Sequence, residues 1–308
     1  MEMKIGGYAA RLCGKKGELQ MKITDILNSG KVTVSCEIFP PKQGAGLEAL
    51  QAVVQATAAL HPSFISVTYG AGGKTGDYTV RLASEVQNNQ NIPALAHLTC
   101  VSSDKASIAR ALDELRAHGI ENILALRGDI PENNPFPSQG QYRYASELIE
   151  SIRDYGGFCI GGACYPEGHP EAATLQKDIE SLKIKVDSGC QFLTTQMFFD
   201  NNILYNYMFR LLKNGIGVPV VAGIMPVTNG RQIARICKLS GAALPPRFRA
   251  IVDKFFENPA AMNQAGVAYA TEQIIDLIAN GVNHIHIYTM NKPDIAARIM
   301  TNLSEIFK

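Results

Sequence analysis

The sequence predicts one (β/α)8 TIM barrel of the α/β class, and three observations support this fold. β-rich segments alternate with helical patterns along the chain. Most of these segments are continuously apolar, which is typical of parallel strands covered on both faces. The length of 308 residues lies within the range of one such barrel. An open, doubly wound parallel sheet is the alternative, because the number of elements does not show that a sheet closes on itself.

Eight segments have the β-rich composition expected of strands. The last of them follows the longest non-periodic insertion, which begins at Pro245-Pro246. The segments are Lys31–Phe39, Phe64–Tyr69, Ile92–Cys100, Asn122–Arg127, Phe158–Tyr165, Phe192–Phe199, Val218–Val227 and His284–Tyr288.

Amphipathic patterns of helical period fill several of the intervals between these segments. Asp104 can cap a helix whose Ile108, Leu112 and Leu115 share one face, and Gly119 can end it. Two further patterns have the same form: Leu175, Ile179, Leu182 and Val186 before Gly189, and Ile274, Ile275 and Ile278 within Thr271–Asn280 before Gly281.

Residues 21–308 are expected to form one domain, because no linker rich in Pro, Gly or Ser divides the chain. Residues 21–27 have the pattern of a natural start. Residues 1–20 are separable from the barrel and are expected to be a poorly ordered leader, a small cap or a misassigned initiation. Their charges and glycines do not match a secretory signal.

Composition excludes several classes of function. Lys plus Arg (29) nearly equals Asp plus Glu (28), so no basic excess is available to hold a nucleic acid. No apolar run is long enough to span a membrane. The seven cysteines are scattered and lack a Cys-x-x-Cys pair, which indicates reduced thiols in a cytoplasmic protein rather than a disulfide framework or a zinc site.

Polar residues are concentrated where the predicted strands end. The carboxyl ends of the strands in such a barrel meet at one face, where active sites collect. Polar side chains inside apolar strands are costly to bury unless they have partners, so their concentration at this end predicts a single active site. The ends supply Glu37, Thr68, Tyr69, His97, Thr99, Arg127, Gly128, Asp129, Tyr165, His169, Gln196 and Tyr288.

Two carboxylates are the leading catalytic candidates. Glu37 stands between Cys36 and Ile38, where partial desolvation should raise its pKa toward a range useful for a general acid. The alternative is an outward-facing or ion-paired glutamate. Asp129 is either a second carboxylate of the site or the cap of a following helix. Together, Glu37 and Asp129 would also suit a glycosidase-like hydrolase, which remains a rival function.

The glycine-rich segment from Gly70 to Gly76 does not fit either common nucleotide motif. Thr68 stands where a Walker loop needs glycine, and Thr75 stands where a dinucleotide fingerprint needs its third glycine. The segment is therefore either a place where backbone N–H groups approach a ligand or a plain flexible turn.

Two histidines and one charged pair do not by themselves indicate a functional site. His97 and His169 lack the spacing and acidic partners of a metal site, so neutral, hydrogen-bonding imidazoles and no metal are expected. Asp178 and Lys185 share one flank of their helix. They are a solvated face by default, unless a phosphate or ribose lies nearby.

Eight motifs make the chain recognisable between residue 31 and about residue 292. They are Cys-Glu-Ile-Phe-Pro-Pro-Lys, Phe-Ile-Ser-Val-Thr-Tyr-Gly-Ala-Gly-Gly, Ala-His-Leu-Thr-Cys, Leu-Ala-Leu-Arg-Gly-Asp, Tyr-Pro-Glu-Gly-His-Pro-Glu-Ala, Thr-Gln-Met-Phe-Phe-Asp, Gly-Ile-Met-Pro-Val-Thr-Asn and His-Ile-Tyr-Thr-Met-Asn. With these motifs the chain closely resembles the methylenetetrahydrofolate reductase family, flavin-dependent barrels that make 5-methyltetrahydrofolate.

The resemblance implies that FAD binds at the carboxyl ends of the strands. It places Thr68, Gln196, Gln232 and Lys292 at the nicotinamide donor or the folate. Lys292 stands where relatives have Arg, and Ile184 occupies a position that is basic in some members. The implied FAD contacts are Tyr69, Ala71, His97, Arg127, Gly128, Asp129, Tyr144, Tyr165, His169, Ala172, Asp178 and Lys185.

The resemblance also implies a ping-pong reaction. NADH or NADPH, or a reduced iron–sulfur partner subunit, would reduce FAD and leave before methylenetetrahydrofolate enters. Glu37 would protonate N10 of the folate and open its closed aminal to an iminium that accepts a hydride. Asp129 would disfavour the anionic reduced flavin and favour the developing cation.

The resemblance further implies a homo-oligomer of the catalytic barrel, without the regulatory domain of eukaryotic members. A non-catalytic partner subunit that inherited the barrel is the remaining alternative.

Overall fold

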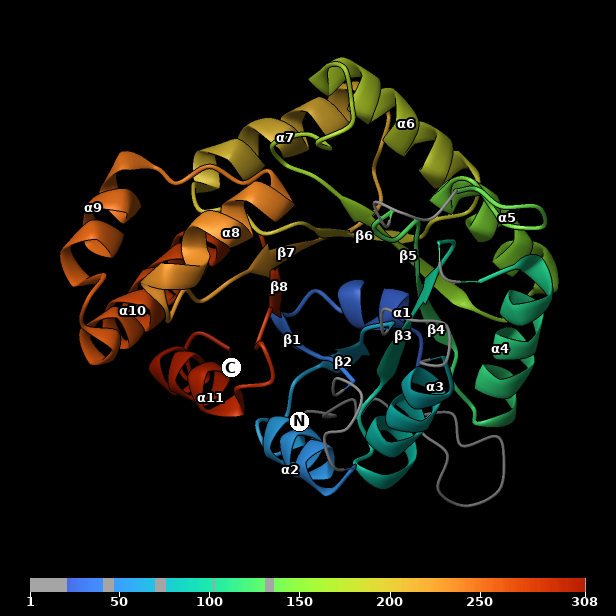
Figure 1. Cartoon of the computed structure of the whole chain (residues 1–308), viewed down its shortest axis with the longest axis horizontal. Coiled ribbons are helices and arrows are strands. Elements are labelled where there is room, and N and C mark those ends of the chain that lie inside the picture. Colours follow the sequence, from blue (N-terminus) through green and yellow to red (C-terminus); the bar gives the residue numbers. More distant parts are fainter. Residues whose placement is uncertain (1–20, 41–46, 70–75, 102, 131–135, 308) are drawn as a thin grey trace, which may run out of the picture.

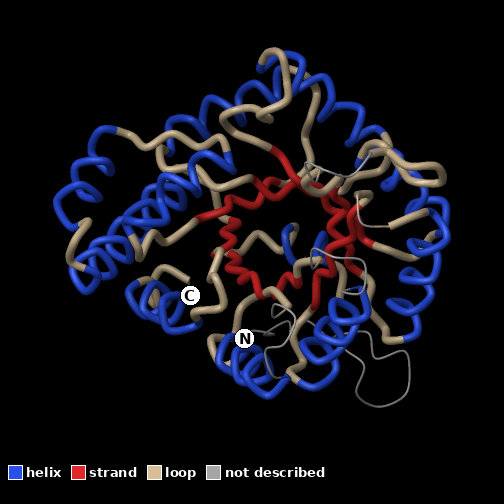
Figure 2. Tube along the Cα trace, in the orientation of Figure 1, coloured by secondary structure: helices blue, strands red, loops and turns tan. Residues whose placement is uncertain are grey.

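The computed structural model describes residues 21–40, 47–69, 76–101, 103–130 and 136–307. Eight parallel strands form a closed barrel in which each strand pairs with the next and β8 pairs with β1. Figure 2 shows the strands as a central ring with the helices around it. The barrel is therefore confirmed, and the open doubly wound sheet is wrong. The expected leader, Cys13, Ala71 and most of the glycine-rich segment lie outside the described residues.

Each of the eight strands lies within a segment that the sequence predicts as a strand. Continuous apolar runs suit these positions because one face of each strand packs inside the barrel and the other packs against helices. The strands are β1 (Thr33–Ile38), β2 (Phe64–Val67), β3 (Ala94–Thr99), β4 (Asn122–Leu126), β5 (Cys159–Cys164), β6 (Phe192–Thr195), β7 (Val220–Ile224) and β8 (His284–Ile287).

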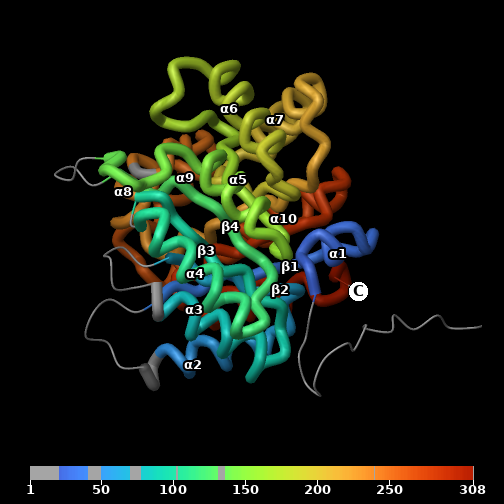
Figure 3. The backbone as a smooth tube through the Cα atoms, turned by 90° about the vertical axis from the view of Figure 1, so that its right-hand side faces the viewer, coloured from blue at the N-terminus to red at the C-terminus, as the bar shows by residue number. Residues whose placement is uncertain are grey.

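Helices form the outer layer of the barrel (Figures 1 and 3). Those that follow the first six strands are α2 (Leu47–Ala58), α3 (Gly76–Ser84) with the π-helical turn η1 (Glu85–Asn89), α4 (Lys105–Ala117), α5 (Ala145–Tyr155), α6 (Leu175–Asp187) and α7 (Asn201–Lys213). Between β7 and β8 lie α8 (Gly230–Ser240), α9 (Pro246–Phe255) and α10 (Pro259–Ala279), and α11 (Pro293–Asn302) follows β8. Within the described ranges, no helix is long and apolar enough to cross a membrane.

The predicted non-periodic insertion is helical, which corrects the sequence-based expectation. Pro246 is the first residue of α9. Its missing N–H costs nothing there, because N–H groups of the first turn have no acceptor within the helix. The helix before β8 begins at Pro259 rather than Thr271, capped by Asn258, which accepts a hydrogen bond from the Ala261 N–H (3.1 Å). Its first half shows no clear apolar stripe of helical period in the sequence, because small residues occupy the packed positions there. A Cβ on Gly266 would lie 1.9 Å from the Val227 carbonyl oxygen.

The predicted helical stripes are largely confirmed. Ile108, Leu112 and Leu115 are buried, and Asp104 accepts a hydrogen bond from the Ser107 N–H (2.7 Å). The predicted place of Leu175 and Ile275 on the buried face is wrong, since their side chains are 42% and 43% exposed. Leu175 is the first residue of α6 and covers Gly168 in the preceding loop instead of the core, where a Cβ on that glycine would meet its Cδ2 at 2.6 Å.

An apolar plug closes the amino end of the barrel. Ile23 and Leu27 of α1 (Ile23–Leu27) pack against a layer of inward side chains that includes Phe64, Leu95 and Phe192. Figure 1 shows α1 within the outline of the strand ring. The same layer contains Leu124, Cys159 and Val221.

The fully buried side chain of Asn122 fastens α1 to the barrel. Its Oδ1 accepts from the Ile23 N–H (2.9 Å), and its Nδ2 donates to the Met21 carbonyl (3.1 Å). These bonds satisfy both halves of a buried amide, which would otherwise be costly. The sequence contained no local signal for this contact, because the partners are about a hundred positions apart.

Candidate active site

Glu37 projects toward the barrel interior near the carboxyl end of β1. Side chains alternate across a strand, and Ser35 on the same face bonds to His286 of β8. Burial raises the pKa of Glu37 from 4.5 to about 7. Its carboxyl group has no hydrogen-bond partner in the part of the chain that the structure describes. The predicted partly desolvated carboxyl is therefore confirmed, and the outward-facing or ion-paired alternative is wrong.

Tyr288 lies close enough to Glu37 to respond to its charge and was not predicted as a catalytic or binding residue. Its hydroxyl donates to the Thr195 carbonyl (2.6 Å). Burial, and then the negative charge of Glu37, raise its pKa well above 10. Gly223 makes room for the ring, because a Cβ there would lie 2.8 Å from the tyrosine oxygen. Tyr288 is therefore a neutral neighbour of the carboxyl group.

Two buried histidines, His286 of β8 and His97 of β3, also face the barrel interior. His286 bonds to the Ser35 hydroxyl (2.8 Å) and approaches the Ser66 hydroxyl (3.4 Å). Burial lowers the pKa of His286 to about 3, and burial together with His286 lowers the pKa of His97 to about 3. Both rings are neutral, as expected for His97. Among the described residues, Nε2 of His97 and Oγ1 of Thr99 are buried without a hydrogen-bond partner.

Gly128 lets the end of β4 approach β3 closely. Its φ is +84°, and a Cβ would lie 3.3 Å from Cβ of Thr99 and 3.4 Å from Cβ of Val101. The predicted helix cap at Asp129 is wrong, because Ile130 after it is not helical and both residues are exposed. Asp129 lies near Arg127 and Tyr165, whose pKa values its charge helps to raise.

Arg127 forms a two-point ion pair with Glu171 from the loop after β5. Its Nη1 and Nη2 donate to the two carboxylate oxygens at 2.6 and 2.7 Å, which raises the arginine pKa. The Glu171 N–H donates to Nδ1 of His169 (3.1 Å), whose ring packs edge-on against Tyr165 at 4.6 Å. Since Nδ1 accepts, Nε2 carries the proton of the neutral His169 ring. Glu171 was missed as a site residue, although its motif was recognised.

Lys185 and Asp178 are not the solvated face that their spacing suggests. The Lys185 ammonium group donates to the Ala163 carbonyl (2.6 Å) behind β5, and burial lowers its pKa. Gly162 leaves space for its stem, because a Cβ there would lie 2.9 Å from Lys185 Cδ. Burial raises the pKa of Asp178, which lies near both Lys185 and His169.

The remaining predicted residues lie around the same end of the barrel. Tyr69 shares a hydrogen bond with the Ser103 hydroxyl (3.0 Å), and Thr68 accepts at its carbonyl from Thr79 (3.1 Å). Tyr144 is half exposed before α5, and Ala172 lies in the loop after β5. Ile184 is 60% exposed on α6.

Gln196 follows β6, and only the oxygen of its side-chain amide has a hydrogen-bond partner among the described residues. Its Oε1 accepts from the Met197 N–H (2.9 Å). Its NH2 group finds no acceptor among the described residues. This NH2 group can therefore donate to a ligand.

A cavity of about 230 Å³ joins the segments after β7 and β8. Gln232 of α8 and Lys292 line it, so the structure brings these two predicted residues together, with Tyr288 in the same wall.

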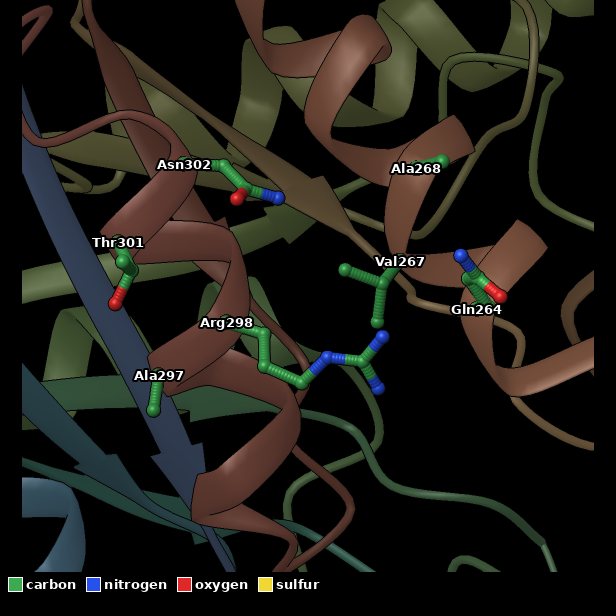
Figure 4. A pocket seen from close by; sticks show the side chains of 7 residues that line it. All are labelled: Gln264, Val267, Ala268, Ala297, Arg298, Thr301 and Asn302. Carbon is green, nitrogen blue, oxygen red and sulfur yellow. The ribbon is translucent and has the colours of Figure 1, made fainter. Parts of the chain in front are cut away.

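A larger cavity of about 400 Å³ lies between α10 and α11 (Figure 4). No predicted site residue lines it. Arg298 there donates to the Asn263 side chain. Among the described residues, no cluster of three or more His, Cys, Asp or Glu side chains could hold a metal ion.

The segment after β8 contains two consecutive residues in the left-handed region, Met290 (φ +53°) and Asn291 (φ +54°). Such conformations cost roughly 1–3 kcal/mol for a residue other than glycine. Asn291 forms two hydrogen bonds with the backbone of Phe39, and Thr289 forms one with the carbonyl of Glu37. The segment that carries Lys292 is thus fastened to the end of β1.

Comparisons with known proteins agree with these observations. Residues 22–304 match the family model described as methylenetetrahydrofolate reductase. The chain is 35% identical over 300 residues to "Methylenetetrahydrofolate reductase (NADH) 1" of Zea mays, which covers 92% of this chain and 50% of that protein. It is 31% identical over 274 residues to "5,10-methylenetetrahydrofolate reductase" of Escherichia coli (strain K12), which covers 89% of this chain and 91% of that protein. The chain spans about half the length of the plant relatives that it matches.

A solved structure shares the fold. An uncharacterized protein from Clostridium thermocellum, which binds two copies of 5-methyl-5,6,7,8-tetrahydrofolic acid, has a TM-score of 0.61 at 15% identity, covering 92% of this chain and 99% of that one. At this identity the likeness concerns the barrel alone.

Proposed function

The chain belongs to the methylenetetrahydrofolate reductase family, and from that premise we propose that it reduces 5,10-methylenetetrahydrofolate to 5-methyltetrahydrofolate as an FAD-dependent oxidoreductase. The observation that carries this proposal is the Glu37 carboxyl group. It lies at the strand end where active sites of such barrels collect, without a partner among the described residues, and its pKa is about 7. A carboxylic acid in this state holds a proton near neutral pH and can donate it.

Glu37 is the general acid in this proposal. The methylene group of the substrate is bound to both N5 and N10, and neither bond breaks readily while N10 is unprotonated. A proton from Glu37 to N10 turns N10 into a leaving group and opens the ring to an iminium at N5. The carbon of that iminium then accepts a hydride.

The barrel mouth fits FAD on two observations. Nε2 of His97 and Oγ1 of Thr99 are buried polar atoms without a hydrogen-bond partner among the described residues, and Gly128 removes the Cβ that would fill the space beside Thr99. When bound, FAD supplies the carrier that takes a hydride from a nicotinamide donor and passes it to folate in a separate half-reaction. The proposed contacts are Tyr69, Ala71, His97, Arg127, Gly128, Asp129, Tyr144, Tyr165, His169, Ala172, Asp178 and Lys185.

Four residues are proposed to contact the substrates. Gln196 presents an open NH2 group, which can donate to a carbonyl of the nicotinamide or the pterin. Thr68 lies at the end of β2, and Gln232 and Lys292 line the cavity beside Tyr288. Asp129, exposed near Arg127, would favour the cation that develops on the folate.

NADH is the first donor to test, since the plant relatives are named for it. NADPH and a reduced iron–sulfur partner subunit are the alternatives. We further propose a homo-oligomer in the cytoplasm. The six described cysteines are free thiols, which suits a reducing compartment. Light scattering of the purified protein checks the oligomeric state.

The test is made in two stages on purified protein. We expect flavin absorbance as isolated or after reconstitution with FAD. Anaerobic stopped-flow mixing with NADH or NADPH should bleach that absorbance, and methylenetetrahydrofolate should restore it. Colourless protein that does not take up FAD would overturn the proposal. Membership of a reductase family over residues 22–304 favours this function over the carboxylate-pair hydrolase and over the non-catalytic subunit.

A further inference from the structure

The Tyr-Thr-Met-Asn segment after β8 grips the end of β1, next to Glu37. Thr289 donates from its hydroxyl to the Glu37 carbonyl oxygen (2.5 Å). Asn291 accepts from the Phe39 N–H with Oδ1 (3.0 Å) and donates from Nδ2 to the Phe39 carbonyl (2.9 Å). Three hydrogen bonds therefore hold the backbone of Glu37 and of the residue two positions after it.

These bonds take the place of a strand ladder that has ended. The last paired residues of β1 and β8 are Cys36 and Ile287. A side-chain amide carries the same donor and acceptor as a peptide group, so Asn291 pairs with Phe39 as a neighbouring strand would. The left-handed turn at Met290 and Asn291 brings this amide back toward β1, and asparagine tolerates that conformation better than most residues.

These contacts matter because they hold the β8 side of the Glu37 backbone, while pairing with Ser66 of β2 holds the other side. The Glu37 carboxyl group has no hydrogen-bond partner among the described residues, so its position depends on where its own backbone is held. The segment that holds this backbone begins at Tyr288, the tyrosine next to the carboxyl group. A small shift at the end of β1 would move the acid relative to a bound substrate.

We propose that Asn291, together with Thr289, is a positioning residue that holds the end of β1 so that the Glu37 carboxyl group is aligned with the bond it protonates. This inference rests on the proposed role of Glu37 as a general acid. Asn291 acts through Glu37 and does not itself touch the reacting atoms.

The chain supplies a matched control at the opposite end of the barrel. Asn122 makes the same two-point contact with a backbone, through Ile23 N–H (2.9 Å) and Met21 O (3.1 Å). It also donates to the Ala94 carbonyl (3.3 Å). None of these partners is a predicted site residue. Removal of the Asn122 amide therefore costs three backbone hydrogen bonds and removal of the Asn291 amide costs two, but of the two amides only Asn291 lies beside the acid.

The principal variant is Asn291→Gly, which removes both bonds and tolerates the positive φ. In the FAD-loaded protein, we expect the rate of flavin reoxidation by saturating methylenetetrahydrofolate to fall about ten- to a hundredfold. The half-saturating folate concentration and flavin reduction by the nicotinamide donor should stay near wild type. Asn122→Ala should lower the melting temperature and leave both half-reactions unchanged.

Two further measurements separate positioning from folding. Amide hydrogen exchange at Phe39, read without substrate, should accelerate in Asn291→Gly. In the Glu37→Gln background, addition of Asn291→Gly should cost little more, because the two changes act through one group. Thr289→Val lacks only the hydroxyl, so it should slow flavin reoxidation by folate less than Asn291→Gly does. It replaces Asn291→Gly as the test variant if that protein does not fold.

Equal slowing of both half-reactions, or full additivity with Glu37→Gln, would overturn the inference and leave Asn291 with a structural role. If Glu37→Gln itself reoxidises normally with folate, the proposed function of Glu37 fails first. The single variants therefore tell the two failures apart.

Discussion

At the amino end of the barrel, inward side chains such as Phe64, Leu95 and Phe192 form an apolar layer that Ile23 and Leu27 of α1 cover. At the carboxyl end, the same inward rows hold Glu37 and the neutral histidines His97 and His286, and glycines replace bulky side chains. The eight strands are continuous between the two ends, so backbone pairing does not distinguish them. The two ends of the barrel differ instead in the side chains that the strands carry there.

The comparison shows how one strand divides its work. In β3 the first inward residue, Leu95, buries apolar area, which stabilises the fold. The last inward residues of the same strand, His97 and Thr99, have buried polar atoms without partners in the part of the chain that the structure describes, and such atoms cost stability until a ligand binds. Mutations at the carboxyl end should therefore reduce activity more than stability. Mutations at the amino end should reduce stability more than activity.

The largest expected effect is on Glu37→Gln. This variant keeps the shape of the side chain but cannot donate a proton. We expect flavin reoxidation by methylenetetrahydrofolate to slow by about 10² to 10⁴, with near-normal flavin reduction by the nicotinamide donor. Anaerobic stopped-flow absorbance follows the two half-reactions separately. Equal slowing of both would assign Glu37 to flavin binding or to the fold.

A cavity at the amino end should produce the opposite pattern. Ile23 is fully buried in α1. Ile23→Ala should reduce the free energy of unfolding by about 2–5 kcal/mol, and Ile23→Val by about 0.5–1.5 kcal/mol. Denaturant unfolding measures both. A loss of folate turnover in protein that is still folded would show that the two ends are coupled.

The pH dependence of stability sharpens the same contrast. The pKa of Glu37 is about 7 in the folded chain and near 4.5 when unfolded, so the folded state binds its proton more tightly. Stability from this group is therefore present below pH 4.5 and is lost as the pH rises through 7. Glu37→Gln cannot ionise, so at pH 8 it should be more stable than wild type by up to about 3 kcal/mol, and nearly equal at pH 4.5. Thermal unfolding at the two pH values tests the sign.

Two ion pairs of the same geometry provide a third test. Arg127–Glu171 and Arg247–Glu272 are both two-point pairs at 2.6–2.7 Å, but the Arg127 side chain is 21% exposed and that of Arg247 is 68% exposed. Glu171→Gln should weaken FAD binding about three- to tenfold, because Arg127 loses its orientation at the site.

Glu272→Gln, on the outer surface between α9 and α10, should leave FAD affinity unchanged. Flavin fluorescence titration compares the variants. Tighter FAD binding by Glu171→Gln would mean that Glu171 competes with the cofactor for Arg127 instead of holding it.

The smallest effect on the fold is expected at Gln196. Gln196→Leu is close in size and removes an NH2 group that has no acceptor among the described residues. The melting temperature should change little, while the half-saturating folate concentration rises several-fold. A large fall in melting temperature with normal kinetics would make Gln196 a structural amide.

The sequence by itself determined the features that depend on local pattern. β-rich composition, with mostly continuous apolar runs, predicted all eight strands, and the polar residues at the strand ends predicted that Glu37, His97, Arg127 and Gln196 share one face. The neighbours Cys36 and Ile38 favoured a desolvated Glu37, although they left an outward-facing or ion-paired glutamate open. These properties are local, because each depends on a few adjacent residues and on the period of the strand.

Only the tertiary structure decided the features that join distant segments. The contacts of Asn291 with Phe39 and of Asn122 with Ile23 span 252 and 99 positions. Lys185 looks like a surface residue in its helix, and only the missing Cβ of Gly162 on another element gives its stem a buried path. A side-chain hydrogen bond depends on atoms that meet when the barrel closes, and no periodicity along the chain records which atoms those are.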